Sequence, residues 1–358
     1  MFVRKHKIQY NNTTLFCMES DPLSSHLPVL KRALDARTGL IQPPHRSALR
    51  LFAGFYEGWN DLVVDLYGST LLLWNYADDP AWLTPDIQQT LIDFYRQNLP
   101  FLRAVWLKTR HALDHEGRTG AFIWGERPDR RIQEHGIWYA IDLGMHQDAS
   151  FYLDTRNLRL WLKEHVTTET EVLNTFAYTG SLGVACLAGG AARVVQVDID
   201  RKFLNLAKDS YSLNGLPIIK GDFVQEDFFH VAARMRRNGS EYDIVIVDPP
   251  YFSRTAGGEV NLVDECVRVI NKARPLVRQG GWLIAVNNAL FLSGKDYYST
   301  LKALCADGYL AIEELLDVPE DITGYAGTRV NPPPVDPSPF NHPTKIAILR
   351  VIKKKSVR

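Results

Sequence analysis

From about residue 154 onward, short apolar runs alternate with amphipathic stretches, and this alternation constrains the fold more than any other feature. The run at 243–247 (DIVIV) is continuous, which is typical of a strand covered on both faces. Strands are predicted at 171–176, 193–197, 217–224, 243–247 and 282–286, and helices at 181–188, 201–213 and 260–277. Repeated βαβ units predict an α/β fold with a Rossmann-like, doubly wound and mostly parallel sheet. Ligands bind such sheets at the carboxyl ends of the strands, where the strand order reverses.

The pattern before residue 140 is less regular and predicts a smaller α+β domain. The sequence predicts a helix at 85–99 and two hairpins, one at 61–66 and 70–74, the other at 131–142. A length of 358 residues suits two domains. We therefore expect an N-terminal α+β region at 1–139 that recognises the substrate, and a catalytic domain at 140–358.

Charge and composition exclude several classes of protein. The chain has 41 Lys+Arg and 41 Asp+Glu, so it is not a polybasic protein that binds phosphates over its whole surface. Basic residues and tryptophans gather at 103–138, but acidic residues offset them, so a nucleic-acid face and an ordinary solvated surface both stay open. We expect a cytoplasmic protein without a membrane partner, since no apolar run is long enough to span a bilayer and residues 1–10 lack a signal-peptide pattern.

The four cysteines, Cys17, Cys186, Cys266 and Cys305, lie far apart in the sequence. None belongs to a C-x-x-C pair, and no histidine stands near one at the spacing of metal ligands. We therefore expect reduced thiols, with neither a disulfide framework nor a metal site.

The first predicted strand-to-helix junction, 174–183 (NTFAYTGSLG), contains two glycines, Gly180 and Gly183. A dinucleotide site needs the fuller G-x-G-x-x-G pattern, in which glycines clear the way for a pyrophosphate on the helix N-terminus. A ligand without phosphates can accept this looser loop. By itself the loop is equally consistent with an ordinary capped helix.

The second and third junctions each place a carboxylate after a strand. Asp198 is positioned to accept hydrogen bonds from both hydroxyls of a ribose, while Asp200 is expected to cap the following helix. The alternative is that the acid at this junction is only a helix N-cap. At the third junction Asp227 is the candidate to accept the exocyclic amine of adenine, with Phe228 against the ring. Asp222 competes with Asp227, because the end of the third strand is uncertain.

The fourth junction is Asp248-Pro249-Pro250-Tyr251, directly after the apolar run at 243–247. Two prolines stop the sheet and stiffen the loop, so that an acid and an aromatic ring are presented rigidly at the sheet edge. This combination suits a planar nitrogenous group that is held and stacked for in-line attack. A purely structural loop has little need of it.

Together these junctions resemble those of class I S-adenosylmethionine-dependent methyltransferases. More narrowly, they resemble the bacterial large-subunit ribosomal RNA methyltransferases, a group with guanine-N7 and cytosine-C5 members. The segments 148–159 (DASFYLDTRNLR) and 173–181 (LNTFAYTGS) are similar to the start of that family's catalytic domain. The resemblance covers 140–350 well and 45–135 loosely, and residues 1–45 hold too little sequence for the RNA-binding PUA domain of some relatives.

The resemblance implies S-adenosyl-L-methionine as the cofactor and ribosomal RNA as the partner. The methionine part of the cofactor would be surrounded by residues of the first loop, namely Phe176, Tyr178, Thr179 and Gly180. Asp198 would hold the ribose, Asp227 the adenine, and Asp248 would lie beside the methyl acceptor.

The residues after the strand at 282–286 bear on the identity of the acceptor. Methylation of cytosine C5 needs a cysteine thiolate that adds to the ring, and in those relatives the cysteine follows this strand. Here Asn287-Asn288 stand at that position, as in the guanine-N7 relatives. The sequence therefore favours transfer to guanine N7 without a covalent intermediate, with Asn287 or Asn288 as further hydrogen-bonding groups.

Several alternatives stay open. Tyr251 also resembles the tyrosine of methyltransferases that modify the exocyclic amine of adenine or cytosine. The acceptor could instead be a small molecule or a protein. Two further alternatives are a nicotinamide-dependent oxidoreductase and an RNA-binding protein without catalytic activity. Nothing in the sequence specifies the oligomeric state, and a homodimer is possible.

Overall fold

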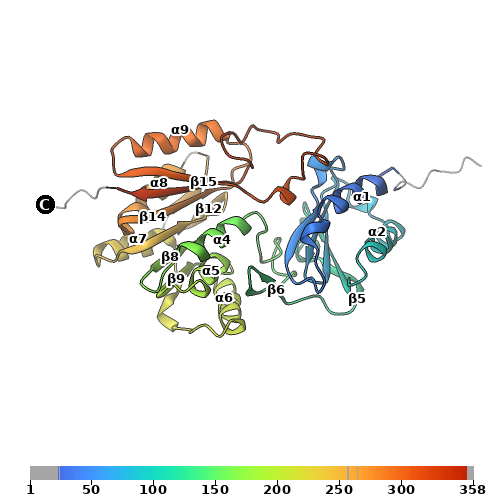
Figure 1. Ribbon diagram of the computed structural model, residues 1–358, viewed down its shortest axis with the longest axis horizontal. Helices are drawn as coiled ribbons and strands as arrows, with labels where there is room; N and C mark the ends of the chain where they lie inside the picture. The colour runs from blue at the N-terminus through green and yellow to red at the C-terminus, as the bar shows by residue number, and fades with distance from the viewer. Residues whose placement is uncertain (1–22, 24, 256–257, 264, 353–358) are drawn as a thin grey trace, which may run out of the picture.

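The structure is a computed structural model that describes residues 23, 25–255, 258–263 and 265–352. Two domains lie side by side: an N-terminal sheet domain and a larger α/β domain (Figure 1). Cys17 and Lys353–Lys355 lie outside the described residues. None of the helices in the described part of the chain is long and apolar enough to cross a membrane.

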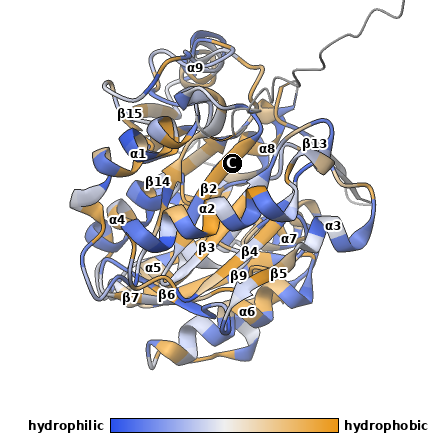
Figure 2. Ribbon diagram, turned by 90° about the vertical axis from the view of Figure 1, so that its right-hand side faces the viewer, coloured by the Kyte–Doolittle hydropathy of each residue, from blue (hydrophilic) through white to orange (hydrophobic). Residues whose placement is uncertain are grey.

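The N-terminal domain contains a five-stranded sheet with two helices on one face. The strands, which lie in sequence order across the sheet, are β1 (Ala48–Phe52), β2 (Leu62–Tyr67), β3 (Thr70–Asn75), β4 (Ala104–Thr109) and β5 (Ala121–Gly125). The predicted hairpin is confirmed as β2 and β3, and the predicted helix as α2 (Pro85–Asn98). With α1 (Leu27–Ala36), α2 lies across this sheet (Figure 2). The short helix α3 (His115–Thr119) joins β4 to β5.

Both faces of the N-terminal sheet are buried, and β3 shows why. Leu71 and Leu73 pack in the cluster that contains the α1 and α2 side chains. Leu72 and Trp74 point to the opposite face and belong to a cluster shared with the α/β domain. The continuous apolar run of β3 is therefore explained by burial against helices on one side and against the second domain on the other.

The second predicted hairpin is confirmed as β6 (Arg131–Glu134) and β7 (Ile137–Ala140). It packs against α6 (Arg201–Leu213): the Asn214 side chain accepts from the Trp138 N–H at 2.9 Å and donates to the Trp138 carbonyl at 2.6 Å. The predicted boundary between 139 and 140 thus lies within a strand that contacts the α/β domain.

The α/β domain is built on a seven-stranded sheet in the order β10-β9-β8-β11-β14-β16-β15. Among the described strands of this sheet, only β16 points in the opposite direction to the others. Chain order reverses between β8 and β11, so the carboxyl ends of these strands form the switch point at which ligands bind. The strands are β8 (Glu171–Thr175), β9 (Arg193–Asp198), β10 (Phe223–Gln225), β11 (Tyr242–Val247), β14 (Val277–Asn287), β15 (Leu310–Leu316) and β16 (Lys345–Val351).

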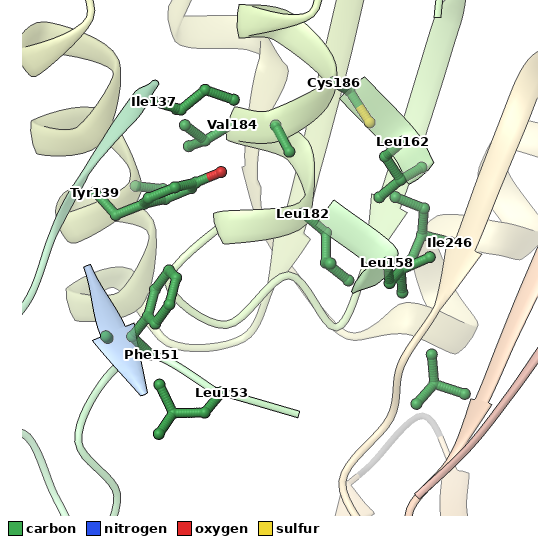
Figure 3. Close-up of a cluster of buried hydrophobic side chains, with 14 of the residues drawn as sticks. Ile137, Tyr139, Phe151, Leu153, Leu158, Leu162, Leu182, Val184, Cys186 and Ile246 are labelled. Atoms are coloured by element: carbon green, nitrogen blue, oxygen red, sulfur yellow. The ribbon is translucent and has the colours of Figure 1, made fainter. Parts of the chain in front are cut away.

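Helices cover both faces of this sheet. One face packs against α4 (Arg156–His165), α5 (Ser181–Ala188) and α6, and Figure 3 shows side chains from α4, α5 and β11 gathered in that core. The other face packs against α7 (Phe228–Arg237), α8 (Cys266–Ala273) and α9 (Gly294–Cys305). The predicted doubly wound α/β fold is therefore confirmed.

The third predicted strand is confirmed as β10, which pairs with β9, but it is shorter than the stretch 217–224, most of which is irregular. One element prediction was wrong. The stretch 260–277 is not one helix: it begins in a hairpin of β12 (Phe252–Thr255) and β13 (Gly258–Asn261) and continues as α8. The helix ends before Pro275, which lacks the N–H that a continued helix would need. Val277 then starts β14, so that strand is longer than predicted.

The chain between β15 and β16 returns to the N-terminal domain (Figure 1). The buried Asp321 carboxylate accepts from the Arg156 guanidinium at 2.8 and 3.1 Å and from the Arg50 N–H at 3.0 Å. The buried Arg37 guanidinium donates to the Asp321 carbonyl at 3.0 Å and pairs with Glu57 at 2.9 Å. This buried charge network joins both domains.

We expect Asp321→Ala to lower the free energy of unfolding by about 3–5 kcal/mol, because it leaves the largely buried Arg156 guanidinium without its bidentate partner and the Arg50 N–H without its acceptor. Burial alone would raise the pKa of Asp321, but the Arg156 guanidinium, the Arg50 N–H and the Arg37 guanidinium together outweigh it and hold this pKa below its usual value. The contribution is therefore present at neutral pH and is lost as the pH falls below 3.8 toward the folded-state pKa. Denaturant unfolding at several pH values measures both effects.

Asp93→Ala is the matched control, since Asp93 pairs with Arg96 on the exposed surface of α2. We expect this control to stay within about 1 kcal/mol of the wild type. Equal stability of the two variants would contradict a central role for Asp321.

Candidate active site

A cavity of about 620 Å³ opens at the carboxyl ends of the strands around the switch point. Residues that follow β8, β9, β10, β11 and β14 line it, together with the segment that precedes α4. The lining includes the following predicted site residues: Phe176, Tyr178, Asp198, Asp227, Phe228, Asp248, Pro249, Pro250 and Tyr251. These side chains therefore surround one cavity at the edge of the sheet where the parallel strands end.

The loop after β8 has an unusual backbone. Phe176, Tyr178 and Gly180 have φ angles of 52°, 50° and 75°, a left-handed conformation that costs about 1–3 kcal/mol for a residue with a side chain. The Tyr178 N–H donates to the Asp198 carboxylate at 2.8 Å, which holds the strained turn. At Gly180 a Cβ atom would lie 2.6 Å from the Ala207 Cβ, so this position requires glycine.

Thr179 and Gly180 shape this loop but do not line the cavity. The buried Thr179 hydroxyl donates to the Ser150 carbonyl at 2.6 Å, which ties the loop to the segment before α4. That these two residues surround the methionine part of a cofactor stays a prediction. The structure shows that they hold the loop in its conformation.

Asp198 stands at the end of β9, where its carboxylate faces the cavity. Burial raises its pKa, although both oxygens accept backbone hydrogen bonds, from Tyr178 at 2.8 Å and from Asp200 at 2.9 Å. Each oxygen keeps a further lone pair for a ligand hydroxyl. Asp200 caps α6 by accepting from the Lys202 N–H at 2.7 Å, as predicted.

Asp227 and Asp222 have distinct surroundings. The Asp227 carboxylate lines the cavity and caps α7 by accepting from the Phe229 N–H at 2.9 Å. The buried Asp222 instead pairs with Arg193 at 2.8 Å and is not part of the lining. The structure therefore brings Asp227, and not Asp222, to the site. Beside it, the rings of Phe228 and Phe176 lie with their centroids 4.7 Å apart.

Asp248 is the most strongly perturbed acid of the site. Burial, and secondly the Asp154 carboxylate, raise its pKa to about 7. Asp154 accepts from the Thr344 hydroxyl at 2.8 Å. Pro249 is buried and Tyr251 is 47% exposed, so the Asp-Pro-Pro-Tyr loop presents an acid inside the cavity and a ring at its mouth.

The sequence reasoning missed the contribution of the segment 142–155. Asp148, Tyr152 and Asp154 all line the cavity, and the Tyr152 hydroxyl donates to the Asp148 carboxylate at 2.9 Å. The buried Lys108 of β4 holds this segment by donating to the carbonyls of His146 at 2.8 Å and Asp148 at 2.6 Å. The pattern FYLDTR was the available signal, but it indicated a family and not individual roles.

Asn287 and Asn288 face different ways. Asn287 is buried: its amide donates to the Leu262 carbonyl at 3.0 Å, and its oxygen accepts from the Ala289 N–H at 2.9 Å. Asn288 lines the cavity, and its buried side-chain oxygen has no hydrogen-bond partner in the described part of the chain. Of the two, the geometry favours Asn288 as the residue that meets a ligand.

No group of three or more His, Cys, Asp and Glu side chains suited to a metal ion occurs among the described residues. The residues gathered at the switch point are instead carboxylates, aromatic rings and amides.

Comparison with known proteins identifies the family. Residues 104–329 match the model of the S-adenosylmethionine-dependent methyltransferases. The chain is 30% identical over 82% of its length to the ribosomal RNA large subunit methyltransferase I of Aeromonas salmonicida, covering 72% of that protein. It is 29% identical over 62% of its length to the enzyme of the same name from Shigella flexneri, covering 56% of it, so it spans little more than half of that relative.

Solved structures show the same fold. One is a chain assigned as a methyltransferase and complexed with S-adenosylhomocysteine, with a TM-score of 0.79 and 22% identity over 93% of this chain and 82% of that one. Another is a methyltransferase from Agrobacterium tumefaciens, with a TM-score of 0.60 and 21% identity over 86% of this chain and 91% of that one. The nicotinamide-dependent alternative is thereby set aside. This chain belongs to the S-adenosylmethionine-dependent methyltransferase family and uses S-adenosylmethionine as its cofactor.

Proposed function

We propose that the protein methylates a base nitrogen of ribosomal RNA, guanine N7, without a covalent cysteine intermediate. The observation that carries this proposal is the composition of the cavity: it joins the carboxylate of Asp198 to the acid and aromatic ring of the Asp248–Tyr251 loop, and none of the described cysteines lines it. The name of the related enzymes supports ribosomal RNA as the substrate.

The residues of the cavity fit the cofactor. Asp198 would hold the ribose by accepting hydrogen bonds from its hydroxyls. Phe176 and Phe228 offer apolar faces to the adenine ring, and Asp227 would accept a hydrogen bond from its exocyclic amine. When bound, S-adenosylmethionine supplies an electrophilic methyl group on a positively charged sulfur.

The described cysteines are remote from the reaction. Cys186 on α5 and Cys266 on α8 are buried in the two cores of the sheet, and Cys305 lies at the end of α9. Burial raises the pKa of the Cys186 and Cys305 thiols, which disfavours a thiolate nucleophile. An acceptor carbon that must first be activated by a thiolate therefore suits this cavity poorly, whereas a nitrogen with its own lone pair needs no such group.

The residues around the acceptor can act by positioning and electrostatics. Guanine N7 carries no proton, so no base has to remove one. Ionised Asp248 can accept from the N1–H and the amino group of guanine, and the Asn288 oxygen can accept a further hydrogen bond. Pro249 and Pro250 stiffen the loop, which keeps the acceptor base in line with the methyl group.

Transfer to an exocyclic amine is the second candidate, and one observation favours it. A carboxylate with a pKa near 7 is suited to accept the proton that an amine must lose, and burial raises the pKa of Asp248 to about 7. The two candidates predict different products.

The product distinguishes these candidates. Ribosomal RNA and large ribosomal subunits from cells that lack the gene are incubated with the purified protein and labelled S-adenosylmethionine, and the nucleosides are separated by mass spectrometry. We expect 7-methylguanosine as the labelled product. A methylated exocyclic amine would select the second candidate, and 5-methylcytidine would overturn the proposal of a nitrogen acceptor. If neither the RNA nor the large subunits become labelled, RNA is not the substrate.

The cofactor assignment of Asp198 is tested by calorimetric titration with S-adenosylhomocysteine. We expect Asp198→Ala to weaken binding by about 10- to 100-fold, since hydrogen bonds from two hydroxyls to a charged acceptor are lost. Asp209→Ala is the matched control, because Asp209 is an exposed carboxylate on the neighbouring helix α6. Equal affinity of the two variants would rule out Asp198 as the ribose ligand.

The pH dependence tests Asp248. If the ionised carboxylate binds the base, kcat/KM for RNA rises with pH through the pKa of about 7. Asp154→Asn removes a negative neighbour of Asp248 and should move the midpoint of this rise to lower pH. Asp248→Asn should remove the pH-dependent rise and reduce kcat by about 100-fold. If kcat/KM for RNA does not change with pH in the wild type, and Asp248→Asn has the same profile, Asp248 does not have this role.

A further inference from the structure

The short loop after β14 carries two exposed apolar side chains at the mouth of the cavity. Leu290 is 57% exposed and Phe291 is 76% exposed, and both belong to the cavity lining. Ala289, just before them, is completely buried. Exposed apolar side chains beside a site are a common mark of a binding surface.

The backbone of this loop is held in place from both sides. The Ala289 N–H donates to the Asn287 side chain at 2.9 Å, and the Ala289 carbonyl accepts from the Lys345 ammonium at 2.9 Å. Lys345 is fully buried and pairs with Asn287 across β14 and β16. Burial of an ammonium group is costly unless it is well hydrogen-bonded, and Lys345 uses one of its two carbonyl acceptors, Ala289, to hold this loop.

Two further exposed side chains of the cavity lining are aromatic. Tyr251 is 47% exposed and Tyr152 is 44% exposed, and both line the cavity that contains Asp248. A base can reach Asp248 only if it leaves its stack, and this leaves the adjacent base with an exposed face. Aromatic and apolar side chains on a fixed backbone can cover such a face at a low cost in conformational entropy.

We propose that Phe291, supported by Leu290, stacks against the RNA base next to the methylated nucleotide and thereby contributes to substrate affinity. Asn287 and Lys345 are positioning residues that act through the Ala289 backbone. This inference rests on the proposed RNA substrate. It assigns a role to an exposed hydrophobic pair that neither the cofactor nor the acceptor base requires.

The test compares Phe291→Ala with Phe291→Tyr in the full-length protein. Methyl transfer is measured with ribosomal RNA and large subunits from cells that lack the gene, and S-adenosylhomocysteine affinity is measured by calorimetry. We expect Phe291→Ala to lower kcat/KM for RNA by about tenfold or more, mainly through KM, with unchanged affinity for S-adenosylhomocysteine. Phe291→Tyr keeps an aromatic ring and should retain most of the activity.

Ile219→Ala is the matched control. Ile219 is 56% exposed, but it precedes β10 and therefore lies toward the opposite edge of the sheet. Wild-type kcat/KM for RNA in Phe291→Ala would overturn the inference while leaving the RNA substrate intact. Loss of S-adenosylhomocysteine binding in Phe291→Ala would also overturn it, in favour of a cofactor role. No transfer to RNA by the wild type would overturn the proposed function and this inference with it.

Lys345→Met tests the positioning role. If Lys345 acts through the loop, Lys345→Met raises KM for RNA as Phe291→Ala does, and the double variant is no worse than the poorer single variant. Additive losses in the double variant would show that Lys345 and Phe291 act independently, which would overturn the positioning role.

Discussion

The buried ion pair between Asp321 and Arg156 connects the two domains to the active site. Arg156 begins α4, directly after Asp154 and Thr155 of the cavity wall. Asp321 belongs to the segment that crosses to the N-terminal domain and returns to supply Thr344 and Lys345. Because these contacts are buried and bidentate, they restrict how the segments before α4 and β16 can move. The geometry of the cavity thus depends on contacts made between the domains.

Two buried lysines extend this dependence to the loops of the site. Lys108, from the N-terminal sheet, binds the carbonyls of His146 and Asp148, while Lys345 binds the carbonyls of Ala289 and Pro343. Burial lowers the pKa of each lysine to about 8. In both cases an ammonium group fixes a backbone segment that lines the cavity. The N-terminal domain is therefore a structural part of the active site.

The chemistry proposed for this site needs little beyond such fixed positions. Methyl transfer to a nitrogen lone pair requires alignment of the acceptor and the exclusion of competing positions. The strained loop at Phe176 and Tyr178 and the two prolines after Asp248 both reduce local freedom. Burial, and secondly the Asp154 carboxylate, raise the pKa of Asp248 to about 7, so that this acid titrates near neutral pH. The ionised Asp248 carboxylate can therefore hold a base, and its binding to the base depends on pH.

The sequence by itself determined the doubly wound sheet and the acids at its strand ends, because strand periodicity and the residues that end a strand are local properties. Asp198, Asp227 and Asp248 could be placed together in this way, since parallel strands end at one edge. The burial of both faces of β3 depends on partners distant in the chain. Whether Asn287 or Asn288 faces the cavity, and whether the segment 142–155 lines it, was decided only by tertiary structure, because long-range contacts through Lys108 and Lys345 fix these loops.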